Sequence, residues 1–299
     1  MCGIVGLFLK DKSLEPHLGD MLSDMLVVMS DRGPDSAGIA IYSGEGARTK
    51  ITLQASDPDT AFSGVASGLE AALSIPVTTT RRDTHLVVEI PQDRLADARA
   101  YLTEAHRELR VMSSGEAVEI YKEVGLPADV VDRFDIRTMS GTHGVGHTRM
   151  ATESAVTTLG AHPFSTDEDQ CLVHNGSLSN HNSLRRKLTR AGMRIETEND
   201  TEVGAAFIAH QMQQGATLGE ALETSLRELD GFYTFVVGTK GGFGVLRDPI
   251  ACKPAVLAET DQYVAFGSEY RALVNLPGIE SARVWEPEPA TVYFWEHAA

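Results

Sequence analysis

Cysteine is scarce in this chain of 299 residues, which contains only Cys2, Cys171 and Cys252. Three widely separated cysteines form neither a disulfide framework nor the paired CxxC spacing of a metal site. A reducing compartment is the simplest setting for such a chain, and we therefore expect a cytoplasmic protein. The composition, 42% hydrophobic and 23% charged, is typical of an ordinary globular protein with a large core.

Positive charge is also in short supply, because 26 Lys and Arg residues face 42 Asp and Glu residues, giving a formal net charge of −16. A chain with this balance repels phosphate backbones and anionic lipid surfaces, so we expect no nucleic-acid partner. No apolar run approaches the roughly 18 residues of a membrane span, and the N-terminus lacks the basic stretch of a signal peptide. Membrane association is therefore not expected either.

The N-terminus places Cys2 directly before a short apolar strand over residues 3–8. Removal of Met1 would give Cys2 a free α-amino group, which titrates near about pH 8 and can act as a base. The thiolate of a cysteine is its reactive form, so the nucleophile and its base would share one residue. The alternative is that Cys2 is simply a small residue at the start of a buried strand.

Later segments predict two sheets covered by helices. A one-faced apolar stripe over residues 18–29 predicts a helix, and a turn over residues 31–38 leads into a strand. Further helices are expected over 180–191, 201–214 and 218–229. Strands are expected over 232–238, 243–246, 255–257, 263–266 and 291–295.

Residues 48–142 have the pattern of a separate module. Strands are expected over 48–55 and 81–90, a helix between Pro91 and Val111, and a closing strand over 117–121. This pattern predicts a small α+β subdomain of ferredoxin-like type. It contains no recognisable catalytic grouping.

Three polar positions have both a structural and a functional interpretation. Arg32 lies on a turn beside a strand end, where it could meet an anion or simply face solvent. Asn175-Gly176 is first of all a turn signal, but an Asn amide and a neighbouring backbone N–H can also form an oxyanion hole. Asp200 stands at a predicted helix start, where capping is the default role. The ten histidines lack the spacing of a zinc site, so no metal is predicted.

Five motifs occur in a fixed order along the chain: Cys2-Gly3-Ile4-Val5-Gly6, Arg32-Gly33-Pro34-Asp35-Ser36-Ala37-Gly38, Gly146-His147-Thr148-Arg149, His174-Asn175-Gly176 and Asn199-Asp200-Thr201-Glu202. This set resembles the class II glutamine amidotransferases, which are N-terminal-nucleophile (Ntn) hydrolases. The resemblance covers residues 2–44 and about 143–299. It implies an α+β fold, a four-layer αββα sandwich formed by one domain over 1–299 that residues 48–142 interrupt.

The resemblance also implies how the chemistry is divided. Cys2 would be the nucleophile and its α-amine the general base, while Asn175 and the backbone N–H of Gly176 would form the oxyanion hole. Attack on the glutamine side-chain amide would release ammonia, leave a thioester on Cys2 and end in hydrolysis to glutamate. No cofactor and no metal are implied.

Substrate binding is carried over in the same way. Arg149 would bind the α-carboxylate of glutamine and Asp200 its α-ammonium group, since arginine offers a bidentate fork to a carboxylate. Thr152 and Arg32 complete the set of substrate-binding candidates.

The chain departs from the family pattern at Met150, where an aromatic residue is common, and at Glu153, where a histidine is common. The stand-alone form and the long insertion resemble the amidotransferase subunit of glutamate-synthase-like systems, including the three-subunit N-methylglutamate synthase. This resemblance implies a hetero-oligomer with a flavin-bearing synthase subunit and a β-helical subunit. Two alternatives are a regulatory or scaffolding subunit with a weakened site and a free-standing amide hydrolase.

Overall fold

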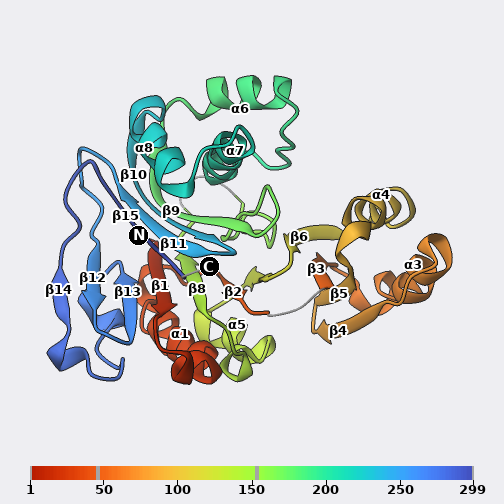
Figure 1. Cartoon of the computed structure of the whole chain (residues 1–299), viewed down its shortest axis with the longest axis horizontal. Helices are drawn as coiled ribbons and strands as arrows, with labels where there is room; N and C mark the ends of the chain where they lie inside the picture. The colour runs from red at the N-terminus through yellow and green to blue at the C-terminus, as the bar shows by residue number, and fades with distance from the viewer. Residues whose placement is uncertain (1, 45–47, 152–154, 298–299) are drawn as a thin grey trace.

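The computed structural model describes residues 2–44, 48–151 and 155–297, which form two stacked sheets and a separate smaller one (Figure 1). The largest sheet has the antiparallel order β14-β12-β13-β1-β8-β2-β7. Its strands are β1 Gly3–Leu9, β2 Ser36–Tyr42, β7 Val118–Val124, β8 His143–Arg149, β12 Val256–Glu259, β13 Tyr263–Gly267 and β14 Arg283–Trp285. The N-terminal strand is thus central, with β13 on one side and β8 on the other.

The second sheet has the order β15-β11-β10-β9 and is also antiparallel. Its strands are β9 Gln170–Leu178, β10 Gly231–Thr239, β11 Gly242–Arg247 and β15 Thr291–Glu296. The helices packed on the two sheets are α1 Leu18–Val27, α5 Pro127–Arg133, α6 His181–Arg190, α7 Asp200–Gln213 and α8 Leu218–Glu228. Short 3-10 turns are η1 Lys12–His17, η2 Ser30–Arg32, η3 Gln92–Arg94, η4 Ile136–Thr138, η5 Tyr270–Ala272 and η6 Ile279–Ser281.

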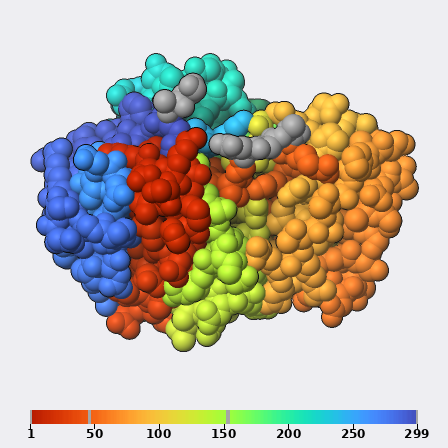
Figure 2. All heavy atoms as spheres, turned by 60° about the horizontal axis from the view of Figure 1, so that its bottom comes forward, coloured from red at the N-terminus to blue at the C-terminus, as the bar shows by residue number. Residues whose placement is uncertain are grey.

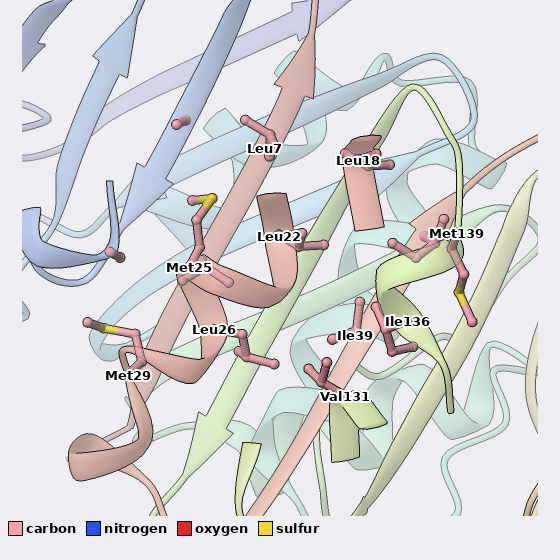
Figure 3. Close-up of a cluster of buried hydrophobic side chains, with 14 of the residues drawn as sticks. Leu7, Leu18, Leu22, Met25, Leu26, Met29, Ile39, Val131, Ile136 and Met139 are labelled. Carbon is pink, nitrogen blue, oxygen red and sulfur yellow. The ribbon is translucent and has the colours of Figure 1, made fainter. Parts of the chain in front are cut away.

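Three buried clusters separate four layers. One fills the space between the first sheet and helices α1 and α5, and Figure 3 shows Leu22 and Met25 of α1 close to Leu7 of β1. A second joins the two sheets, and a third lies between the second sheet and α6, α7 and α8. The expected four-layer αββα sandwich is therefore confirmed, and the apolar stripe from Leu18 is core, as its helical spacing predicts.

Strand β1 is buried on both faces because it lies in the middle of this sandwich. Val5 and Leu7 pack toward α1, whereas Ile4 and Phe8 pack between the sheets. This alternation follows from the period of two in a strand. At Gly6 the sheets approach so closely that an added Cβ would lie 2.5 Å from the Phe243 ring.

The inserted module has its own sheet of order β4-β5-β3-β6 and its own core. Its elements are β3 Arg48–Gln54, α2 Pro58–Ala61, α3 Val65–Leu73, β4 Thr78–Arg82, β5 His85–Pro91, α4 Leu95–Ala105 and β6 Arg110–Gly115. The antiparallel order and the helices after β3 and β5 are those of a ferredoxin-like fold. In Figure 2 the module, in orange, is seated directly beside the sandwich.

Two details of this region differ from the sequence expectation. The strand expected over 81–90 is a hairpin of β4 and β5, because Asp83 takes a left-handed conformation between them. The strand expected to close the module is β7, which instead pairs with β2 in the main sheet. The β-branched pattern of β7 suits either sheet. Its pairing with β2 at the edge of the main sheet therefore decides to which sheet it belongs.

The module is therefore inserted into the turn of a hairpin. Strands β2 and β7 pair along their full length, Tyr42 lies opposite Val118, and the Ser43 N–H donates to the Ala117 carbonyl at 3.0 Å. Asp169 fixes the segment that leads from the module back into β7, because its carboxylate accepts hydrogen bonds from the N–H groups of Glu116, Ala117 and Val118. The two ends of the module are thus adjacent in space.

We predict that Gly6→Ala lowers the free energy of unfolding by about 1–3 kcal/mol, because the added methyl group overpacks the contact with Phe243. Urea denaturation measures the difference. Gly241→Ala is the matched control, since an added Cβ there meets nothing within 4 Å. Equal stability of the Gly6→Ala variant and the wild type would contradict the close sheet contact.

Candidate active site

Cys2 lies immediately before β1, at the edge of the sandwich. The N–H of Gly3 donates to the Thr148 hydroxyl at 3.2 Å, and the N–H of Ile4 donates to the Ser268 hydroxyl at 2.9 Å. These two bonds tie the start of β1 to the strands on both of its sides. The Cys2 side chain is half-buried, and its Sγ lies 3.9 Å from the carbonyl oxygen of Met150. The thiol is thus held at a strand end with access to solvent.

Two side chains from distant parts of the sequence meet at the carbonyl oxygen of Cys2. Arg32 Nε donates to it at 3.0 Å, and Asn175 Nδ2 donates to it at 3.1 Å. Both side chains are buried, with Arg32 8% and Asn175 4% exposed. Arg32 also forms an ion pair with Glu269, while its Nη2 atom has no hydrogen-bond partner in the described structure. The structure thus brings Cys2, Arg32 and Asn175 together.

Gly176 follows Asn175 within strand β9 and does not form a turn. Its φ of 142° lies in a region that side chains rarely adopt, and an added Cβ would lie 2.0 Å from the carbonyl oxygen of Phe232. The local turn interpretation of Asn175-Gly176 is therefore wrong, because β9 continues to Leu178 and pairs with β10. The glycine instead permits the two strands to approach closely beside Cys2.

Arg149 and Asn199, the residue before Asp200, both lie next to Gly160. Arg149 ends β8 and is 7% exposed, and an added Cβ on Gly160 would lie 3.4 Å from its Nη1 atom. The Gly160 carbonyl accepts from Asn199 Nδ2 at 3.5 Å, one residue before Asp200. A cationic and an anionic group therefore lie on segments that meet at one glycine. Thr152 and Glu153 lie outside the described residues.

The capping role expected for Asp200 belongs to its neighbour. Asn199 Oδ1 accepts from the Thr201 N–H and caps α7, while Asp200 is the first helical residue. One Asp200 oxygen accepts from the Leu178 N–H at 2.9 Å, and the other lies 3.7 Å from His174 Nδ1. Asp200 is thus fixed against β9, two residues beyond Gly176.

Known proteins share this sequence and fold. A family model described as a glutamine amidotransferase domain matches residues 147–275. The chain is 66% identical over 298 residues, 99% of each chain, to the glutamine amidotransferase-like protein GlxB of Rhizobium meliloti strain 1021. The chain belongs to the class II glutamine amidotransferase family.

Other relatives match parts of the amidotransferase. A glutamine–fructose-6-phosphate aminotransferase of Idiomarina loihiensis is 32% identical over 127 residues, 42% of this chain and 21% of that protein. Among solved structures, a glutamine phosphoribosylpyrophosphate amidotransferase from B. subtilis superposes with a TM-score of 0.62. It is 19% identical and covers 99% of this chain and 47% of that chain, which shows the shared fold.

A cluster of three buried histidines lies beside Asn175 of the candidate site. His162 Nε2 and His174 Nδ1 both share hydrogen bonds with the Thr201 hydroxyl, at 2.7 and 3.0 Å. The His147 ring stacks on His162, and its Nε2 lies 3.1 Å from the His174 carbonyl, next to Asn175. Burial lowers the pKa of His147 to about 3 and lowers the pKa of His162 and His174. The rings are therefore neutral, and the His147 ring holds the backbone carbonyl of His174, next to Asn175.

Sequence reasoning missed several supports of the site. Thr148 and Ser268 hold the first N–H groups of β1, and Asp35 accepts from the Ala151 N–H at 2.8 Å. Thr148 and Asp35 belong to the quoted motifs, so their position could have indicated them. Ser268 and Glu269 follow β13 with no local motif, and only the pairing of β13 with β1 reveals them.

The described residues contain no group of three or more metal-ligating side chains, and within the same residues no helix is long and apolar enough to span a bilayer. The three histidines of the cluster are instead engaged by hydrogen bonds to Thr201 and by the stacking of His147 on His162.

The histidine cluster makes stability depend on pH. An unfolded histidine binds a proton near pH 6.5, whereas folded His147 binds one only near pH 3, so the unfolded state holds more protons between these values. The free energy of unfolding should therefore fall by about 1.4 kcal/mol per pH unit for this group as pH decreases through that window. The variant His147→Gln should show a correspondingly shallower pH dependence in denaturant titrations. His17→Gln, at an exposed histidine, is the control, and an identical slope in both variants would contradict the neutral buried ring.

Proposed function

We propose that this protein hydrolyses glutamine with Cys2 as the N-terminal nucleophile and supplies the ammonia to a separate synthase subunit. The observation that carries the proposal is the meeting of Arg32 Nε and Asn175 Nδ2 on the Cys2 carbonyl, at 3.0 and 3.1 Å. This contact fixes the backbone of the nucleophile beside the oxyanion-hole candidate. Both side chains are buried, so these hydrogen bonds offset the free-energy cost of burying their polar groups.

The proposed chemistry begins when the α-amine of Cys2, exposed by removal of Met1, accepts the thiol proton. The sulfur attacks the amide carbon of glutamine, and the oxygen of the tetrahedral intermediate accepts hydrogen bonds from Asn175 and the Gly176 N–H. Collapse breaks the carbon–nitrogen bond, and the amine returns its proton to the leaving ammonia. Water then adds to the thioester, which yields glutamate and restores the thiol.

The same proposal assigns the substrate's amino-acid group to Arg149 and Asp200. Arg149 offers a bidentate fork for the α-carboxylate, and Asp200 an anionic partner for the α-ammonium group. Both are held by protein contacts, Arg149 at the end of β8 and Asp200 by the Leu178 N–H. Arg32 Nε donates to the Cys2 carbonyl at 3.0 Å, so we assign it a positioning role there.

We predict that Cys2→Ala reduces glutamine hydrolysis at least 10³-fold, since it removes the attacking sulfur and little volume. Glutamate release, followed by an enzyme-coupled assay, measures the loss. Cys171→Ala and Cys252→Ala are matched controls at the other two cysteines and should keep wild-type rates. A Cys2→Ala variant with most of the activity would contradict the mechanism, and a wild-type protein without activity would favour the weakened scaffolding subunit.

The proposed partners are a flavin-bearing synthase subunit and a β-helical subunit of a glutamate-synthase-like or N-methylglutamate synthase complex. Ammonia released into water at neutral pH becomes mostly ammonium, which is a poor nucleophile. An acceptor protein should therefore dock where it receives ammonia away from bulk solvent. A free-standing hydrolase would need no such partner.

We assign the inserted module to this docking. It contacts the sandwich through an ion pair of Lys50 with Glu119 at 2.7 Å and one of Arg133 with Asp83. The Thr84 hydroxyl adds a hydrogen bond to Glu123 at 3.2 Å. A module inserted at a surface turn can extend a docking face without disturbing the two sheets of the sandwich.

We predict that replacing residues 44–116 with Asn-Gly leaves glutamine hydrolysis within about threefold of wild type, because the dipeptide closes the β2–β7 hairpin. Binding to the synthase subunits and glutamine-dependent product formation should fall at least tenfold. Co-purification measures the first and product formation with purified subunits the second. Wild-type binding and product formation by the replaced variant would contradict the docking role, and the alternative that the module only covers a sheet edge would then hold.

A further inference from the structure

We propose that the cleft between the module and the sandwich binds a small anion with at least two negative charges, a phosphate or a dicarboxylate. The cleft has a volume of about 310 Å³. This lies at the lower end of the range for small-molecule pockets, about 300–1,000 Å³, so the occupant is small.

The cleft has one wall from each part of the molecule. The module contributes the end of α4 and strand β6, and the sandwich contributes the loop around residues 164–167 and the segment over 194–202. A second hollow shares Arg99, Arg107 and Arg194 with it and continues outward. A ligand held there would touch both parts at once.

Basic groups dominate the lining although the chain as a whole is acidic, with a net charge of −16. The cationic or titratable basic side chains in the lining are Arg99, His106, Arg107, Arg110, Lys122 and Arg194. Four guanidinium groups in one concave site repel one another, and a bound anion removes that cost. Guanidinium forks also match phosphate and carboxylate oxygens in geometry.

The carboxylates in the lining are already engaged. Glu202 accepts from the N–H groups of Glu196 and Thr197 at 2.7 and 2.6 Å. Asp167 accepts from Gln213 Nε2 at 2.8 Å. Glu196 forms an ion pair with Arg194 at 2.5 Å. The lining acids are therefore oriented by contacts of their own segments, and four arginines against three carboxylates leave the lining with a net positive charge.

Three of the arginines form no ion pair within 4.0 Å among the described residues, although the charge of Arg99 interacts with Glu168 over a longer distance. Arg99 Nη1 donates to the Ser114 hydroxyl at 3.3 Å, and Arg110 Nη1 donates to the Arg107 carbonyl at 2.9 Å. In the described residues, no carboxylate oxygen lies within 4.0 Å of a guanidinium nitrogen of Arg99, Arg107 or Arg110. The neutral contacts orient the guanidinium groups and leave their charge available for a ligand.

The test is isothermal titration calorimetry of the full chain at fixed ionic strength, in separate titrations with inorganic phosphate and with glutarate. At least one probe should bind saturably with a dissociation constant at or below about 10 mM. Saturation by phosphate alone identifies a phosphate site, and saturation by glutarate alone identifies a dicarboxylate site. Failure of both probes to saturate would overturn the proposal. Titration of the Cys2→Ala variant keeps this result separate from the proposed hydrolysis, since the cleft does not include Cys2.

The triple variant Arg99→Gln/Arg107→Gln/Arg110→Gln should weaken binding at least tenfold. Its matched control is Arg186→Gln/Lys187→Gln/Arg190→Gln, which also removes three positive charges, but from exposed positions of α6 outside the cleft. The control should bind within twofold of wild type, and equal loss in both triple variants would overturn the proposal in favour of bulk charge. Arg107→Gln alone alters an exposed side chain, so folding is preserved, and it should still weaken binding at least threefold. Unchanged affinity in this single variant and in the triple variant would place any bound anion elsewhere.

Discussion

The carbonyl oxygen of Cys2 accepts two hydrogen bonds, and the arrangement of the site depends on them. Arg32 reaches it from the turn after α1, and Asn175 reaches it from β9 in the opposite sheet. Residues near a chain terminus ordinarily fray, because few contacts hold their backbone. Here Arg32 from the turn η2 and Asn175 from strand β9 fix the Cys2 backbone, and the Thr148 and Ser268 hydroxyls fix the two N–H groups that follow.

The close packing of the two sheets makes this convergence possible. Asn175 lies on one sheet and Cys2 on the other, so their contact requires a short distance between strands β1 and β9. Gly6 permits the sheets to approach each other under the Phe243 ring, and Gly176 permits the close approach of β9 to Phe232 of its neighbour β10 within one sheet. Glycine in strand interiors ordinarily weakens a sheet, and at these two positions its missing side chain allows the close contact that the site needs.

Local patterns were sufficient to predict much of this molecule. The apolar stripe from Leu18 gave the right helix, and the ordered motifs predicted both the αββα sandwich and the family. Local patterns failed where a partner far away in sequence decides the outcome. Asn175-Gly176 has the composition of a turn, yet pairing with β10 keeps it within a strand. Strand β7 has a pattern that either sheet could use, and only its pairing with β2 assigns it to the main sheet. Ser268 and Glu269, which contact Ile4 and Arg32, likewise follow strand β13, which is far from β1 in the sequence and pairs with it in the fold.

The central claim is that Cys2, as the first residue of the mature chain, is the nucleophile. The most direct measurement is peptide mass spectrometry of the active protein after reaction with a glutamine analogue that carries an electrophilic ketone in place of the side-chain amide. The account predicts a single adduct on an N-terminal peptide that starts at Cys2 without Met1, with loss of activity in proportion to labelling. Full activity in a protein that retains Met1, or inactivating adducts on Cys171 or Cys252, would contradict it.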